Sequence, residues 1–217
     1  MKHLERSFTR GEFFLKFRLY LHLAVALLFV FSCSAQTTPL ESSIGGNVYT
    51  NFFFRFRYEF SSSWVSEPVS MVGEMEKRDR EGNLPDSAKA PNSYKLLSLV
   101  RTFPGQGPNG RSRAQISLTA EQVPTRSEIT DGKDAVLKFT NKLKKQRYTP
   151  VGKLQELAIN GHTFFRQDMK GKSEGAEVYQ SGVFTVCNGY VVGFLLTSPT
   201  QSLLDNMAST LDKIQFF

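Results

Sequence analysis

Residues 49–65 read YTNFFFRFRYEFSSSWV, and this stretch decides how the fold begins. From Phe54 onward an aromatic residue stands at every second position, and charged residues stand between. Side chains of a β-strand point alternately to its two faces. The pattern therefore predicts one strand over residues 49–60, with one face against a core and the other in water. Three serines end this strand, and Trp64 follows them.

Downstream, the apolar pattern predicts six further strands and three helices. The strands are expected at residues 94–103, 114–123, 151–159, 162–171, 176–187 and 190–198. A short helix begins near Pro68, a second is capped by Asp131, and a third opens after Ser198 and Pro199. The second helix carries an apolar stripe of Ala135, Val136, Phe139 and Leu143, and the third carries one of Leu204, Met207, Leu211 and Ile214.

Two Asn-Gly pairs decide how the last four strands are connected. Asn160-Gly161 and Asn188-Gly189 each separate two apolar runs, and Asn-Gly readily adopts the positive φ angles of a tight hairpin. Hairpins join antiparallel strands. We therefore predict an α+β domain over residues 49–217, with a mostly antiparallel sheet of about six to seven strands and helices packed on it. Residues 36–48 are small and polar, which is typical of a flexible leader.

Residues 1–35 have the features of a secretory signal peptide. A basic stretch precedes a 13-residue run, Leu19 to Phe31, that is apolar except for His22. Small residues then favour cleavage between Ala35 and Gln36. Two alternatives stay open: an uncleaved membrane anchor, although a span needs about 20 residues, and a lipoprotein signal in which Cys33 carries the lipid. The protein is thus expected to be secreted or periplasmic, and membrane-tethered under either alternative.

The charge of the chain does not indicate a nucleic-acid partner. Removing residues 1–35 removes five basic and two acidic residues, which lowers the formal net charge from +7 to +4. The one dense basic run consists of Lys142, Lys144, Lys145 and Arg147. Such a run is typical of a solvated helix face, so we expect no nucleic-acid contact.

The residues that metal and nucleophilic chemistry need are scarce. Of the three histidines, His3 and His22 belong to the signal, and His162 follows an Asn-Gly turn, where a surface position is expected. Cys33 and Cys187 are the two cysteines, and Cys187 lies in an apolar strand, where a buried, inert thiol is expected. One histidine without a cysteine pair predicts no zinc site, and we expect no cofactor. Two short stretches match catalytic or cofactor motifs in their letters only. GKSEG at residues 171–175 has the G-x-S-x-G spacing but is expected to be a hairpin loop. GQGPNG at residues 105–110 has the G-x-G-x-x-G spacing, but this loop contains Pro108 and leads into a strand and not a helix, so we assign no catalytic residue.

Carboxylates and scattered aromatics leave two questions open. The acidic residues of 74–81 alternate with basic ones, which is typical of a solvated face. A glycosidase-like carboxylate pair could still come from elsewhere in the fold. The aromatic residues Tyr49, Phe52, Phe53 and Trp64 could line a ligand pocket, although core packing is the simpler interpretation.

Two stretches resemble the PsbP-like fold family, which includes extrinsic photosystem II subunits, Mog-type Ran-binding proteins and bacterial DcrB-like envelope proteins. YTNFFFRFRYEFSSSWV resembles the family's aromatic strand and the turn before its Trp, although Ser63 stands where Gly is usual. NGYVVGFLLTS, with the LLDNMASTLDKIQFF that follows, resembles its last strand and closing helix. The resemblance covers residues 47–217. It implies the α+β fold but no active site, because the family shares none.

These observations predict an exported cell-envelope protein that is a non-enzymatic binding or accessory module. Its partner would be a protein or a small ligand, bound through a sheet face or the loops. Membrane contact is expected only through the signal segment or a lipid on Cys33. Two alternatives are a secreted carboxylate-dependent hydrolase and a lipoprotein assembly factor tethered through Cys33.

Overall fold

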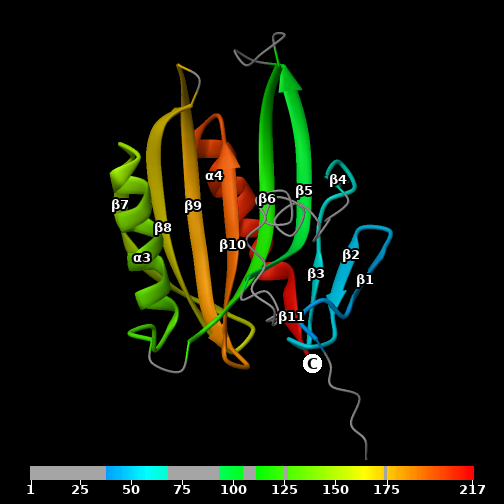
Figure 1. Cartoon of the computed structure of the whole chain (residues 1–217). Helices are drawn as coiled ribbons and strands as arrows, with labels where there is room; N and C mark the ends of the chain where they lie inside the picture. The colour runs from blue at the N-terminus through cyan, green and yellow to red at the C-terminus, as the bar shows by residue number, and fades with distance from the viewer. Residues whose placement is uncertain (1–37, 68–92, 105–110, 125–126, 174) are drawn as a thin grey trace, which may run out of the picture. The chain divides into compact units, whose positions relative to one another are not determined.

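A computed structural model describes residues 38–67, 93–104, 111–124, 127–173 and 175–217 (Figure 1). Several sequence predictions lie outside these residues. They concern the signal peptide with Cys33, Ala35 and Gln36, the helix near Pro68, the acidic residues of 74–81 and the loop at 105–110.

The predicted antiparallel sheet is confirmed. In the described part of the chain, seven strands pair in the order β4-β5-β6-β10-β9-β8-β7, and each pairing is antiparallel. The strands are β4 (Val65–Ser66), β5 (Ser93–Pro104), β6 (Arg111–Gln122), β7 (Thr149–Ile159), β8 (His162–Ser173), β9 (Ala176–Cys187) and β10 (Tyr190–Ser198). Both Asn-Gly turns have the expected positive φ angles, 44° and 83° in the first and 51° and 76° in the second.

The stretch at residues 49–60 forms a hairpin and not the single strand that its alternation predicted. Strands β2 (Val48–Asn51) and β3 (Phe56–Glu59) pair across a turn at residues 52–55. Asn51 causes the turn, because its Oδ1 accepts the backbone N–H of Phe54 at 2.8 Å. Its Nδ2 donates to the Pro39 carbonyl at 2.9 Å. Arg55 completes the turn with a positive φ of 55°.

A second, smaller sheet was not predicted. Its order is β1-β2-β3-β11, where β1 is Ser42–Gly45 and β11 is Ile214–Phe216. Strand β1 lies in the segment that was assigned to a flexible leader. Strand β11 includes Ile214, which was expected in the last helix; α4 (Gln201–Ser209) instead ends earlier and continues as a 3-10 turn, Thr210–Lys213.

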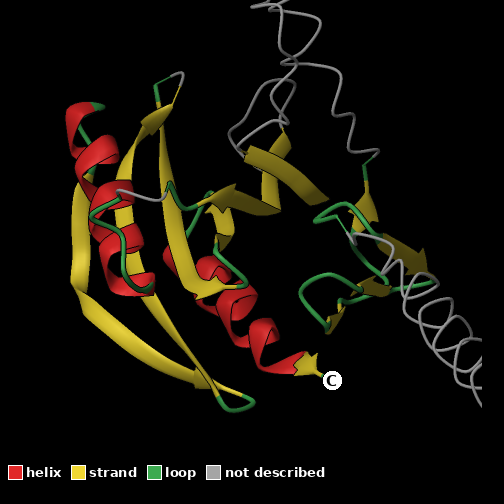
Figure 2. Ribbon diagram, turned by 60° about the horizontal axis from the view of Figure 1, so that its bottom comes forward, coloured by secondary structure: helices red, strands yellow, loops and turns green. Residues whose placement is uncertain are grey.

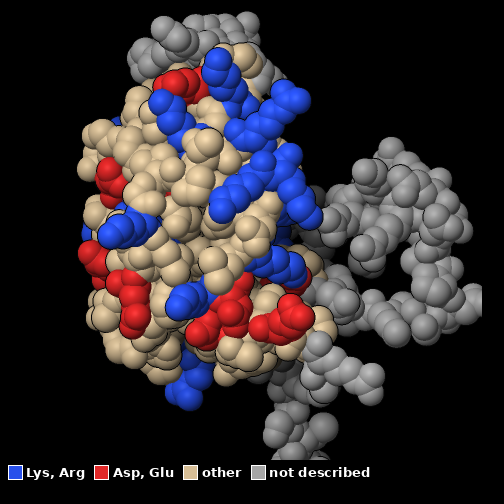
Figure 3. All heavy atoms as spheres, turned by 90° about the vertical axis from the view of Figure 1, so that its left-hand side faces the viewer, with Lys and Arg blue, Asp and Glu red and all other residues tan. Residues whose placement is uncertain are grey.

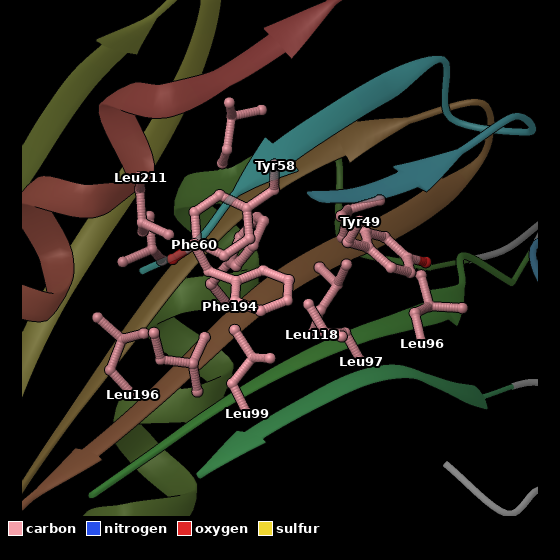
Figure 4. Close-up of a cluster of buried hydrophobic side chains, with 14 of the residues drawn as sticks. Tyr49, Tyr58, Phe60, Leu96, Leu97, Leu99, Leu118, Phe194, Leu196 and Leu211 are labelled. Atoms are coloured by element: carbon pink, nitrogen blue, oxygen red, sulfur yellow. The ribbon is translucent and has the colours of Figure 1, made fainter. Parts of the chain in front are cut away.

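The main core fills the space between the small sheet, α4 and one face of the large sheet. Tyr58 of β3 and the adjacent Phe60 point toward Phe194 of β10, and Leu211 closes this cluster from the 3-10 turn (Figure 4). The Tyr58 and Phe194 ring centroids are 5.8 Å apart in an edge-to-face arrangement. The helix α4 thus covers a sheet face, as predicted.

Helix α3 (Gly132–Lys145) covers the opposite face of the large sheet, so that the two helices lie on either side of it (Figure 2). Asp131 caps the helix as predicted, because its Oδ1 accepts the Asp134 N–H at 3.0 Å. Successive residues of β9 point to opposite faces of the large sheet: Val183 lies in the main core, and Phe184 packs with α3. Gly182 leaves room for this contact, because a Cβ there would lie 2.7 Å from the Phe139 ring. Among the described residues, no helix combines the length and apolar character that crossing a bilayer requires.

Candidate functional site

The hollow between the two sheets is too small to be a ligand pocket. Aromatic side chains of β3, β8, β10 and β11 line it together with Thr185 and Cys187. Its interior has roughly the room that one water molecule needs. Sites for small molecules occupy about 300–1,000 Å³. This part of the core is therefore filled by its own side chains.

The Cys187 thiol lies at this hollow and is half-buried, which is less than the full burial predicted from its apolar strand. Burial raises the pKa of Cys187 above its ordinary value. A thiol with a raised pKa is protonated near neutral pH and is a poor nucleophile. The prediction of an unreactive thiol thus agrees with its surroundings.

His162 is exposed at the first residue of β8, as expected. Its ring stacks on that of Phe216, with the centroids 3.7 Å apart. Within the described residues, no hydrogen bond joins His162 to a carboxylate or a hydroxyl group. The arrangement of a histidine base between a nucleophile and an acid is therefore not formed by these residues.

Among the described residues, the most buried carboxylate, Asp168, belongs to a charged cluster that attaches α4 to β8. Arg166 donates two hydrogen bonds of 2.8 Å to Asp168 and one of 2.7 Å to Asp205 of α4. Gln201 also donates to Asp168, at 2.9 Å. Burial alone would lower the pKa of Arg166, but its bonds to the two carboxylates raise that pKa above its ordinary value. Both carboxylates are thus hydrogen-bonded to one guanidinium, and they serve to attach α4 to β8.

The described residues hold no group of three or more metal-ligating side chains. The basic run at the end of α3 is exposed, as predicted for a solvated face. Figure 3 shows Lys and Arg side chains over the upper part of the surface that contains α3 and β7. Cations at a helix C-terminus are favoured by the helix dipole, so these residues have a structural explanation.

The four aromatic residues singled out in the sequence separate into two groups. Tyr49 and Trp64 are buried in the main core. Phe53 is half-buried, and the Phe52 side chain is 51% exposed. Phe217 is 55% exposed as well, and no sequence pattern marked it as a surface residue. Phe217 lies near the turn at residues 52–55 only because β11 pairs with β3, a pairing that the sequence did not reveal.

We call the surface formed by Phe52, Phe53, Arg55, Phe216 and Phe217 the aromatic end. Its parts are joined by hydrogen bonds, since the Phe217 N–H donates to the Arg55 carbonyl at 2.9 Å. The β9–β10 turn supports it from the large sheet. There Asn188 Nδ2 donates to the Phe53 carbonyl at 2.9 Å, and the Tyr190 ring packs edge-on against that of Phe53. Hydrogen bonds and ring packing therefore fix the backbone that carries the exposed aromatic side chains.

The fold is similar to that of a cyanobacterial PsbP. The solution structure of this protein, CyanoP from Synechocystis, matches with 11% sequence identity over 83% of this chain and 100% of that one, with a TM-score of 0.48. The sequence resemblance named the same family. LpqN from Mycobacterium tuberculosis, described as involved in cell envelope biogenesis, matches with 16% identity over 74% of this chain and 82% of that one, with a TM-score of 0.43. No protein-family model and no curated protein matches the chain.

Proposed function

We propose that this chain is an exported, non-enzymatic accessory protein of the cell envelope that binds another protein through the aromatic end. The observation that supports this most directly is the exposure of Phe52 on the turn at residues 52–55 and of Phe217, whose backbone N–H bonds to Arg55 of that turn. Large apolar side chains that gather on a surface mark interaction sites more often than single exposed ones do.

The composition of the aromatic end suits a protein partner. Interface cores are enriched in aromatic residues and Arg and depleted in Lys, Glu and Asp. Residues 51–58 contain four Phe, two Arg and no acidic residue. Full burial of one Phe side chain contributes about 1.5–3 kcal/mol, so covering the exposed parts of Phe52 and Phe217 would give a moderate gain.

The alternative of a carboxylate-dependent hydrolase has less support. Such an enzyme needs a cleft that holds substrate between two carboxyl groups, one of them protonated. The hollow between the sheets is apolar and nearly filled, and Asp168 and Asp205 are paired with Arg166. The proposal that the protein is exported rests on residues 1–35 alone.

Photo-cross-linking in intact cells tests the proposed function. A benzophenone amino acid placed at Phe52 should give a discrete adduct with one envelope protein. The same amino acid at Leu137 of α3 is the matched control, because Leu137 is also apolar and 47% exposed. We expect no adduct, or a different and weaker set, from position 137. Equal adduct patterns from both positions would contradict binding at the aromatic end.

A further inference from the structure

Strand β1 forms an edge of the small sheet that nothing in the described residues covers. It lies beside β2 only (Figure 1). All four of its residues, Ser42–Gly45, are exposed. An edge strand presents unpaired backbone groups that can pair with another chain.

One hydrogen bond shows which backbone groups of β1 face outward. In an antiparallel ladder, pairs that exchange hydrogen bonds alternate with pairs that do not. The Phe52 N–H donates to the Glu41 carbonyl at 2.9 Å. The register pairs Ser42 with Asn51, so Glu41 stands opposite Phe52. It follows that Ser43 and Gly45 bond to β2, whereas Ser42 and Ile44 direct their N–H and C=O groups to the open edge.

Ile44 also belongs to a row of core side chains that is incomplete at β1. The register places Ile44 opposite Tyr49, Tyr49 opposite Tyr58, and Tyr58 opposite Ile214. Directly opposed residues lie on the same face of a sheet. Tyr49, Tyr58 and Ile214 are almost fully buried, but Ile44 is 49% exposed. A fifth strand with an apolar residue beside Ile44 would complete the row.

Two other edges in the described residues, β7 and β11, carry features that discourage pairing. Strand β7 contains Pro150 and Lys153, and Gly152 takes a φ of 70° within an irregularity of the ladder. Proline, lysine and irregularities are common protections of edge strands. At β11, the Ile214 carbonyl already accepts a hydrogen bond from the Asn160 side chain. Strand β1 has no Pro, no charged residue and no irregularity.

We propose that β1 receives an extended segment of the partner protein as a fifth strand of the small sheet. This inference rests on the proposed function and specifies how the partner binds. The segment would carry an apolar side chain beside Ile44. It would also carry an acidic residue at the end that lies near Arg55, because the edge itself is uncharged and Arg55 is exposed on the adjoining turn.

Interface area favours such a segment over a second copy of this chain. Pairing the four-residue edges of two copies would bury far less than the roughly 1,200 Å² of a stable complex. A segment that continues from β1 onto Phe52 and Arg55 covers both the edge and the aromatic end. Strand addition of this kind gains affinity from the backbone and specificity from alternate side chains.

A synthetic peptide probe tests the inference on the whole chain. The probe alternates Thr and Val and ends in two Asp residues, and its matched control has Pro in place of the central Val. NMR spectra should show that the probe shifts the amide signals of Ser42 and Ile44 and slows their hydrogen exchange. The amides of Ser43 and Gly45, which already bond to β2, should change much less. Unchanged Ser42 and Ile44 signals at millimolar probe, or equal shifts with the Pro peptide, would overturn the inference.

Two substitutions at one position separate the backbone from the side chain. Ile44→Pro removes the outward N–H but no bond to β2, because proline is tolerated on the open side of an edge strand. Ile44→Thr keeps the N–H. We expect probe affinity to fall about tenfold in Ile44→Pro, as for the loss of a hydrogen bond worth about 1.4 kcal/mol, and by less in Ile44→Thr. Equal affinities of Ile44→Pro and the parent chain would overturn strand addition.

The two proposals can fail separately. If Phe52 gives an adduct but the probe leaves the amide signals of Ser42 and Ile44 unchanged, only strand addition is contradicted. The absence of a specific adduct at Phe52 would contradict the proposed function. An unchanged β1–β2 ladder in the NMR spectrum of Ile44→Pro is the check that this variant folds.

Discussion

At the scale of single residues, Tyr58 links the core to the pH dependence of stability. Its side chain is fully buried, and its hydroxyl shares a 2.7 Å hydrogen bond with Thr210 Oγ1. Burial raises the pKa of Tyr58 to about 12, and the bond to Thr210 lowers it only in part. In the unfolded chain the group ionises near its ordinary value of 10.0.

The neutral form of Tyr58 is favoured by folding, so its contribution is complete below pH 10 and is lost as the pH rises from 10 to 12. A shift of two pKa units corresponds to a loss of about 2–3 kcal/mol in the free energy of unfolding. Urea unfolding between pH 8 and pH 11.5 should therefore show a smaller loss of stability in Tyr58→Phe than in the parent chain. The other titrating groups are common to both proteins and cancel in the comparison. Parallel pH curves would contradict this role of Tyr58.

At the scale of secondary-structure elements, sequence pattern identified elements that carry their own local signals. Asn-Gly turns join β7 to β8 and β9 to β10, and α3 has a capping Asp131 and an apolar stripe. The hairpin at residues 49–60 was missed because its aromatic alternation continues through the second strand. The decisive signal was the buried side chain of Asn51, which bonds back to the chain and turns it. Strand β11 was missed because Ile214 continues the helical spacing of α4.

The attachment of α4 to β8 gives a prediction at the same scale. The Asp168 side chain is 9% exposed and pairs with Arg166, which is 12% exposed. Asp205 also pairs with Arg166, but its side chain is 55% exposed. Removing one partner of a buried ion pair costs about 3–5 kcal/mol, whereas an exposed partner contributes about 1 kcal/mol or less. Urea unfolding should therefore find Asp168→Ala much less stable than Asp205→Ala. Equal losses in the two variants would show that the buried pair does not hold this helix.

At the scale of the whole molecule, the aromatic end shows where prediction from the sequence stops. The sequence identified Phe52 and Phe53 as aromatic residues with two alternative roles. Phe217 lies at the other end of the chain, and the two regions meet only because β11 pairs with β3. No local pattern reports such a pairing between distant segments. The row of opposed residues from Ile44 to Ile214 could not be predicted for the same reason, because it depends on the register of four strands.

The last prediction concerns the mature N-terminus that the proposed signal peptide would leave. This terminus would be free after simple cleavage and tethered to the membrane if Cys33 carries a lipid. Five basic residues precede the apolar run at residues 19–31, which is shorter than the about 20 residues of a membrane span. Cleavage after Ala35 should thus leave a chain that begins at Gln36. Intact-mass spectrometry of the protein from the envelope fraction should find this mass, and Cys33→Ser should not change it. A diacylglyceryl mass on a chain beginning at Cys33, lost in Cys33→Ser, would instead establish a lipid tether and would confine binding at β1 and Phe52 to partners near the membrane.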